Sequence, residues 1–346
     1  MIADAAAERA RTAGDEAGGL LAQVAFAFFK TETSIESEVD ELERLARKAL
    51  PLLEQAGNHA GLAYVWRVLG DPVANFRGRF EEWAHSAEQA LRHTRLAGRN
   101  PSTVLGLDEA LVYGPRPADE ALRTLDAVLP ESPSPAPLLL RALLLTMLGR
   151  FDEADSIARE PADRWSDLMG DDRADVFLGP IASIAGRYED AAFHLGRRCR
   201  FLEARGSRGH LSTYAPALGR VLCKLGRHEE AAPLARLGRE LADDQDASAQ
   251  MLWRQLQALV DSSRGHHSDA EQLAREAVTI TERTDALNWQ GDAFSDLAEV
   301  LHAAGRRDEA EAALTQALER YERKLNLAQA AQTRARLAGM RGGGAS

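Results

Sequence analysis

The chain has 346 residues, of which 45% are hydrophobic, and a formal net charge of −11. This acidic balance argues against direct nucleic-acid binding, which needs a basic face. No apolar run approaches the roughly 18 residues of a membrane-spanning helix, and the N-terminus lacks a signal-peptide core, so we expect a cytoplasmic protein that does not bind membranes.

The N-terminal part of the chain predicts one pair of helices. Residues 15–30 and 35–56 carry the hydrophobic periodicity of helices that face each other. We expect Pro51 to bend or interrupt the second helix of this pair. Residues 1–34 are assigned to the N-terminal helices of this first, incomplete pair.

A short pattern then recurs along the chain. It is a glycine, usually a basic residue, one further residue, two acids and an alanine, as in Gly149–Ala154. The glycines lie at positions 78, 114, 149, 186, 226, 265 and 305, which are 36, 35, 37, 40, 39 and 40 residues apart. A nearly fixed period of this length indicates a repeat array. We place the array over residues 35–323.

Each occurrence of the pattern is interpreted as the joint between two helices. The glycine can adopt a left-handed conformation and end the first helix. The acids in the first turn of the second helix are stabilised by its dipole, by about 0.3–1 kcal/mol each. The alanine allows close packing, and because Trp83 replaces it after Gly78, we expect that pair to pack differently. Since the acids recur in every unit, they are helix starts rather than an acid/base pair.

The remaining segments complete the predicted order. Residues 130–137, "PESPSPAP", predict a loop between helix pairs. A capping helix is expected over residues 324–340, and residues 341–346 form a flexible tail. The predicted fold is all-α: an α-solenoid of stacked antiparallel helix pairs, each slightly longer than the ~34 residues of a tetratricopeptide unit.

Particular segments carry a resemblance to a known family. They include "LVYGPRPADEAL" (111–122), "ARGSRGHLSTYAPALG" (204–219) and "ALNWQGDAFSDLAEVL" (286–301), of which the "YGPRP" turn and the "RGHLST" segment are the most particular. They resemble tetratricopeptide repeats, and more narrowly the C-terminal repeats of actinobacterial-type signalling regulators. In those regulators a class III adenylate/guanylate cyclase or DNA-binding domain precedes an AAA-type ATPase. The resemblance covers about residues 20–338 and implies that such upstream domains are partners in the same system.

The sequence contains no familiar motif of catalysis or cofactor binding. It lacks the Walker-type, dinucleotide-binding, H-E-x-x-H, C-x-x-C and G-x-S-x-G patterns. We therefore expect that the protein is not an enzyme and that it binds no cofactor and no metal. His266 and His267 are interpreted as joint residues. Cys199 and Cys223 are expected to be buried or half-buried free thiols. The five tryptophans are spread over different units and are expected to pack in or near the core.

The concave surface is the remaining candidate site, because the first helix of each pair lines it in such solenoids. Residues thirteen, ten, six and three positions before each joint glycine would face this groove. From that set, the predicted partner-binding residues are Arg173, Thr213, Arg220, Gln255, Asp292 and Glu299.

The mixed polarity of these residues favours a protein or peptide segment as the partner. We therefore expect a non-catalytic scaffold or sensor module of a bacterial signalling regulator. Three alternatives stay open: a self-association module that forms homodimers, an enzyme with a site hidden between repeats, and a solvated groove without a partner.

Overall fold

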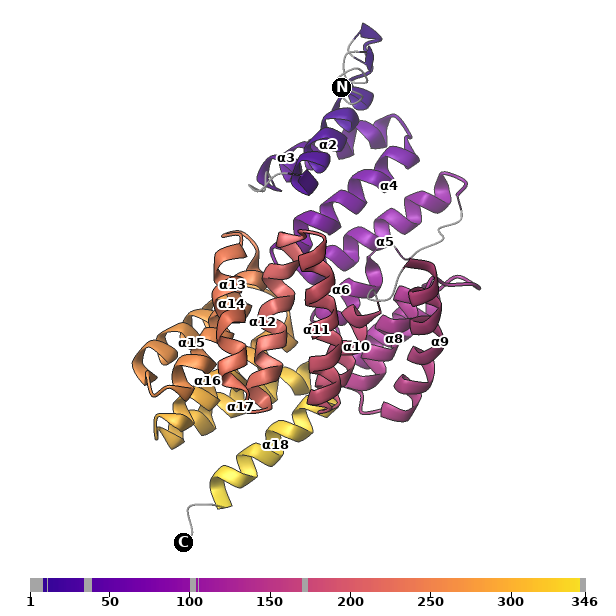
Figure 1. Cartoon of the computed structure of the whole chain (residues 1–346). Coiled ribbons are helices and arrows are strands. Elements are labelled where there is room, and N and C mark those ends of the chain that lie inside the picture. The colour runs from indigo at the N-terminus through magenta and orange to yellow at the C-terminus, as the bar shows by residue number, and fades with distance from the viewer. Residues whose placement is uncertain are drawn as a thin grey trace.

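The computed structural model describes residues 9–10, 12–33, 39–99, 104, 106–169 and 174–342, and the labels below follow Figure 1. Every regular element among these residues is helical. The elements are α2 (Glu16–Thr33), α3 (Val39–Gln55), α4 (His59–Val68), the π-helical turn η1 (Leu69–Ala74), α5 (Phe80–Leu96), α6 (Leu107–Tyr113), α7 (Ala118–Val128), α8 (Pro135–Met147), α9 (Phe151–Met169), α10 (Asp175–Ile184), α11 (Tyr188–Ala204), α12 (Arg208–Lys224), α13 (His228–Leu241), α14 (Ala247–Ser263), α15 (His267–Thr281), α16 (Leu287–Ala303), α17 (Arg307–Lys324) and α18 (Leu327–Gly342).

Consecutive helices pack against each other as pairs, from α2 with α3 through α16 with α17. Each pair also contacts the next, so that the helices stack into a curved array (Figure 1). Helices α2 and α18 lie at opposite ends of the molecule (Figure 1), and α18 packs against α17 and contacts α8. The predicted all-α solenoid is confirmed. None of the described helices is both long and apolar enough to cross a membrane.

The joint glycines behave as predicted at all positions but one. The left-handed conformation occurs at Gly78, Gly149, Gly186, Gly226, Gly265 and Gly305, with φ between +65° and +82°. At Gly114 the prediction is wrong, because φ is −75° and ψ is −178°. Gly114 precedes a proline, which disfavours helical backbone in the preceding residue. A Cβ there would lie 2.6 Å from the Ala110 carbonyl oxygen and 3.0 Å from the Phe80 Cβ, so close packing requires glycine.

The basic residue of the joint forms ion pairs that the sequence pattern did not predict. Arg227 pairs with Glu230 on the next turn at 2.7 Å. Other arginines reach the preceding repeat: Arg264 lies 2.9 Å from Glu229, and Arg306 pairs with Glu271. These pairs connect neighbouring units along the outside of the array. Because they are solvent-exposed, each contributes at most about 1 kcal/mol.

Two expectations about prolines are corrected in part: Pro51 does not interrupt its helix, and the loop predicted over residues 130–137 is shorter. Helix α3 continues through Pro51 to Gln55. Buried Ala49 and Leu53 flank this proline on the packed face, and their burial outweighs the one backbone hydrogen bond that proline removes. The loop predicted over residues 130–137 is shorter, because α8 begins at Pro135. Proline is compatible with the first turn of a helix, where an N–H has no intrahelical acceptor.

Trp83, which replaces the small joint residue, is accommodated by two glycines. Its side chain is 2% exposed and lies in the main hydrophobic cluster. A Cβ on Gly70 would lie 2.5 Å from the Trp83 ring, and a Cβ on Gly106 would lie 2.9 Å from its Nε1. The indole therefore occupies space that these two residues leave open. This pair does pack differently from its neighbours, as the sequence indicated.

The array closes on itself through contacts between its two halves. The carboxylate of Asp285 accepts the backbone N–H groups of Phe80 and Glu81 at 2.8 and 2.9 Å. It thereby caps the first turn of α5 from a position 205 residues away in the sequence. A side-chain acceptor at a helix N-terminus satisfies donors that have no intrahelical partner. Two distant units are thus held side by side.

Lys324 makes the second contact between the halves. The side chain is fully buried, and its Nζ donates to the carbonyl oxygens of Leu111, Gly114 and Arg116 at 2.8, 2.7 and 2.8 Å. Three carbonyl acceptors match the three donors of an ammonium group, and Leu111 lies in the last turn of α6, where the helix dipole favours a cation. Burial opposes the charge and lowers the pKa of Lys324 to about 7. Lys324 therefore connects α17 to the end of α6.

Candidate functional site

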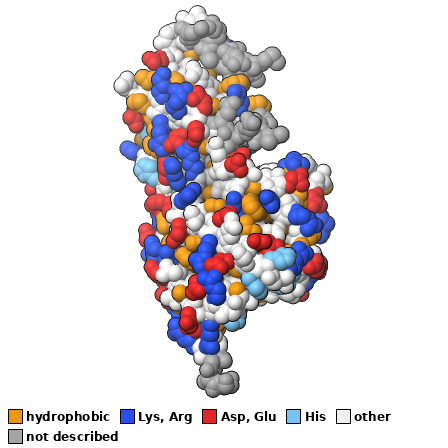
Figure 2. Space-filling view, turned by 90° about the vertical axis from the view of Figure 1, so that its left-hand side faces the viewer, with side chains coloured by type: hydrophobic (Ala, Val, Ile, Leu, Met, Phe, Trp, Pro, Cys, Tyr) orange, Lys and Arg blue, Asp and Glu red, His pale blue; other side chains and the backbone are white. Residues whose placement is uncertain are grey.

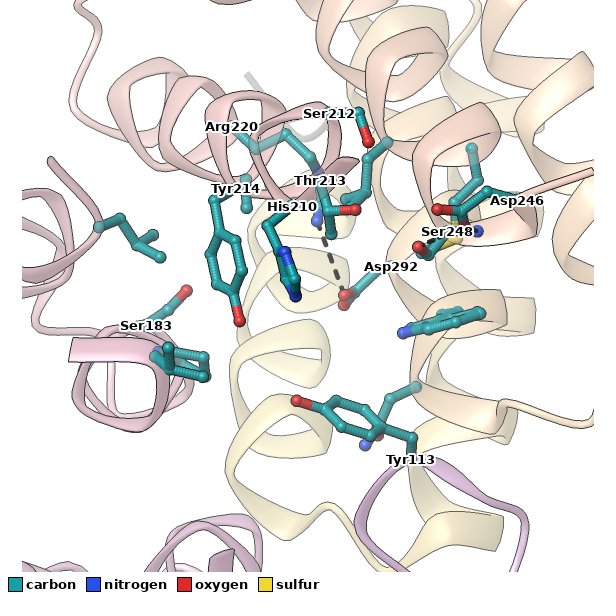
Figure 3. A pocket seen from close by; sticks show the side chains of 18 of the residues that line it. Tyr113, Ser183, His210, Ser212, Thr213, Tyr214, Arg220, Asp246, Ser248 and Asp292 are labelled. Carbon is teal, nitrogen blue, oxygen red and sulfur yellow. Dashed lines mark hydrogen bonds and ion pairs between the residues drawn. The ribbon is translucent and has the colours of Figure 1, made fainter. Parts of the chain in front are cut away.

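The closure surrounds a cavity of about 1110 Å³ on the concave side of the array (Figure 3). Side chains from α6, α10, α12, α14 and α16 line it, together with residues from α5, α17 and α18. The volume lies at the upper end of the range for small-molecule pockets. It is sufficient for a short peptide segment or a large organic ligand.

Three of the predicted partner-binding residues come together beside this cavity. Arg220 on α12 lies 2.8 Å from Asp296 and 3.7 Å from Asp292, both on α16. One turn along, the Lys224 Nζ lies 2.6 Å from the Glu299 carboxylate. Opposite charges on α12 and α16 therefore pair across the concave surface. We refer to Arg220, Lys224, Asp292, Asp296 and Glu299 as the ionic cluster.

The ionic cluster satisfies its own charges. Asp296 is 1% exposed and contacts both cations, and Tyr321 donates its hydroxyl to Asp292 at 2.6 Å. Burial disfavours ionised Glu299, but the pairing with Lys224 outweighs it and lowers the pKa of this carboxyl. Because breaking a buried pair leaves an uncompensated charge, the cluster holds α12 against α16. These charges are not free to bind a ligand.

The other predicted residues lie in different surroundings. Thr213 lines the cavity from α12 (Figure 3). Gln255 has no exposed surface, and neither its amide oxygen nor its nitrogen has a hydrogen-bond partner in the described part of the chain. It therefore offers no contact to a partner in this conformation. Arg173 lies outside the described residues.

An aromatic wall of Phe80, Tyr113, Tyr214 and Trp289 also lines the cavity, and the selection from the repeat period missed it. The Trp289 ring lies 5.0 Å from Phe80 and 6.5 Å from Tyr113, measured between ring centroids. Tyr113 and Tyr214 both point into the cavity, from α6 and α12 respectively (Figure 3). Burial raises the pKa of both tyrosines, that of Tyr214 to about 12. Both phenols are therefore neutral hydrogen-bond donors at physiological pH.

The sequence did contain a signal for this wall. The two most particular segments, "YGPRP" and "RGHLST", contribute Tyr113, His210 and Thr213 to the cavity lining. Thr213 also belongs to the groove positions selected from the repeat period, whereas Tyr113 and His210 do not. These segments therefore add lining residues that the repeat period does not predict.

Two acids face the cavity next to the aromatic wall. Glu109 lies one turn before Tyr113 on α6, and Asp71 lies in η1. Burial raises the pKa of Glu109 to about 7, with further increases from Asp108 and Asp71. Burial also raises the pKa of Asp71, whose carboxylate accepts a bond from Asn75 at 3.3 Å. No hydrogen bond or ion pair connects Glu109 to another described side chain.

The other polar groups considered from the sequence do not form a reactive site. Both cysteines are buried free thiols, as predicted, and burial raises the pKa of each to about 12. Thiols with such pKa values are poor nucleophiles at neutral pH. The described residues contain no group of three or more His, Cys, Asp or Glu side chains arranged around a metal position.

The outer surface in Figure 2 carries both signs of charge. Lysine and arginine side chains are interspersed with aspartate and glutamate over this face, and neither sign gathers into a continuous patch. This distribution agrees with the exposed ion pairs between joints. The concave cavity is therefore a more distinctive feature than the face shown.

Comparison with known proteins supports the class that the fold defines. Stacked helix pairs around a concave surface define an α-solenoid. A family model described as a tetratricopeptide repeat matches residues 291–332, which cover most of α16, all of α17 and the start of α18. A search of the curated proteins finds no match to this chain. The matched unit and the repeated architecture together support a tetratricopeptide-repeat protein.

Proposed function

We propose that this protein is a non-catalytic binding module that takes a peptide segment into its concave cavity. The observation that carries the proposal is a cavity of about 1110 Å³ that is lined by aromatic side chains and by charged side chains paired with one another. Aromatic walls provide contact area, and convergent polar groups orient a ligand. Tetratricopeptide repeats generally mediate protein interactions, which agrees with this role.

The cellular context of the proposal comes from the sequence resemblance. We propose that the module is the cytoplasmic sensing or scaffold part of a bacterial signalling regulator. Because residues from both halves of the array line the cavity, a bound peptide contacts both halves at once. Binding would then favour the closed array and relay a signal through its curvature. Small-angle scattering profiles that are identical with and without a bound peptide would contradict this relay.

A pair of threonine variants tests the binding site. Thr213→Trp places an indole ring in the cavity lining, whereas Thr279→Trp adds the same side chain on the exposed face of α15. Fluorescent nonapeptide pools are titrated against both proteins, and binding is followed by anisotropy. We expect binding to wild type and to Thr279→Trp, and a loss of at least tenfold in Thr213→Trp. Equal binding to both variants would place the peptide outside the cavity.

The self-association alternative has its own test. Light scattering across micromolar concentrations gives a single monomeric mass if the cavity serves a separate ligand. A dimeric mass that Thr213→Trp abolishes would instead identify a second copy of this chain as the occupant.

A further inference from the structure

The carboxylate of Glu109 is the feature of the cavity that the fold does not explain. Every other acid near the cavity centre has an internal role: Asp292 and Asp296 belong to the ionic cluster, and Asp246 caps α14 through the N–H groups of Ser248 and Ala249. Glu109 faces the same cavity without a hydrogen bond or ion pair to any described residue. A partly buried carboxylate is costly unless a donor or cation pairs with it.

The charge of the lining points to the sign of the missing partner. Among the described residues, seven acidic side chains line the cavity against three basic ones, which are Arg208, Arg220 and Lys224. Arg220 and Lys224 are held by the ionic cluster, and Arg208 lies 3.6 Å from Glu240 at an exposed position. Among the described residues that line the cavity, no cation is therefore available for Glu109; Arg198 lies outside this lining, with its guanidinium carbon 5.3 Å from the Tyr214 ring centroid. The cavity as a whole attracts a cationic group.

The aromatic wall suits a cation of organic type. Tyr113 lies one turn from Glu109 on the same face of α6, and its ring lies 6.5 Å from Trp289. Tyr214 enters the same space from α12 (Figure 3). An ammonium or guanidinium group gains energy from contact with aromatic faces and pairs with a carboxylate at the same time.

We propose that the bound segment inserts a lysine or arginine side chain between Tyr113, Tyr214 and Trp289, with its cationic end on Glu109. Asp71 supplies a second carboxylate to the same group. This assignment rests on the proposed function and specifies the ligand chemistry for that cavity. The free protein leaves Glu109 unpaired because its counterion arrives with the ligand.

Peptide pools that differ only at their central residue test this chemistry. Four fluorescent nonapeptide pools carry arginine, lysine, citrulline or glutamate at the centre, and citrulline keeps the shape of arginine without its charge. We expect the arginine or lysine pool to bind at least tenfold more tightly than the citrulline and glutamate pools. Glu109→Gln should remove this preference, whereas Glu319→Gln, at an exposed position on α17, should keep it.

Tyr113→Leu provides a second variant, because it removes the aromatic face and keeps the carboxylate. Tyr113→Leu should weaken the binding of the arginine and lysine pools at least fivefold. Circular dichroism confirms that each variant folds before binding is measured. Competition with agmatine and spermidine then distinguishes a cation on a peptide side chain from a cation on a free amine. If these amines bind as tightly as the pools, the ligand is a free amine and the peptide part of the assignment is wrong.

The results distinguish this inference from the proposed function. If all four pools bind alike, Thr213→Trp blocks them and Glu109→Gln has no effect, the cavity binds peptides but the cationic assignment is wrong. If no pool and no amine binds to wild type, both proposals are wrong. A charge preference lost in Glu109→Gln and retained in Glu319→Gln supports both.

Discussion

Replacing Lys324 with methionine would test whether the array is held closed by a single buried side chain. Methionine has a similar length and no donor, so packing is largely kept while the carbonyl oxygens of Leu111, Gly114 and Arg116 lose their partner. An unpaired buried polar group costs about 1–3 kcal/mol, and partial hydration lowers the total. We expect Lys324→Met to lower the free energy of unfolding by about 3–5 kcal/mol.

The assay is urea denaturation followed by tryptophan fluorescence, together with small-angle scattering of the folded protein. Arg323→Met, on the exposed neighbouring position of α17, is the matched control and should change stability by less than about 0.5 kcal/mol. Opening of the array should also raise the radius of gyration of Lys324→Met. If Lys324→Met unfolds within about 1 kcal/mol of wild type and keeps its scattering profile, the three hydrogen bonds do not hold the halves together.

Three further predictions concern the helix joints, the packing glycines and the cavity acid. Ala154→Trp should cost about 3 kcal/mol or more because Ala154 is fully buried, whereas Glu153→Gln should change thermal stability little. Gly291→Ala places a Cβ 2.6 Å from the buried Tyr321 ring and should destabilise the fold by about 1–3 kcal/mol; an alanine at Gly209, which meets no atom within 4 Å, should not. Affinity for a cationic peptide should fall about tenfold from pH 8 to pH 6, because an acid with a pKa of about 7 is protonated over that range. Asp108, Asp71, Tyr113 and Tyr214 interact electrostatically with that acid, and His210 lines the same cavity. A fall that persists in Glu109→Gln would assign the pH dependence to one of these groups.

The repeat period predicted most of the local structure. The recurring glycine, acids and small residue act locally, within one joint. The glycine ends a helix, the acids begin the next helix, and the small residue lets the two helices pack closely. The fold class and the left-handed glycines followed from it. The exceptions arose at Pro51, where the packing of α3 overrode a local rule, and at Gly114, where the following proline and close packing favour a non-helical backbone.

The candidate site could be predicted only in part. The concave location of Thr213, Arg220 and Asp292 followed from their position before the joint glycine. The period could not show that Arg220 and Asp292 neutralise each other, because they lie on different repeats. Nor could it show that Glu109 has no partner, since a carboxylate in a first turn is an ordinary sequence feature.

The sequence by itself determined the helix pairs, their joints and the order in which they stack, since each of these depends on residues close together in the chain. Only the tertiary structure decided that the array closes. Asp285 caps α5 across 205 residues, and Lys324 reaches carbonyl groups that become available only where α6 ends. Closure depends on the summed curvature of all the repeats, which no single repeat encodes. The cavity and its unpaired carboxylate are consequences of that closure.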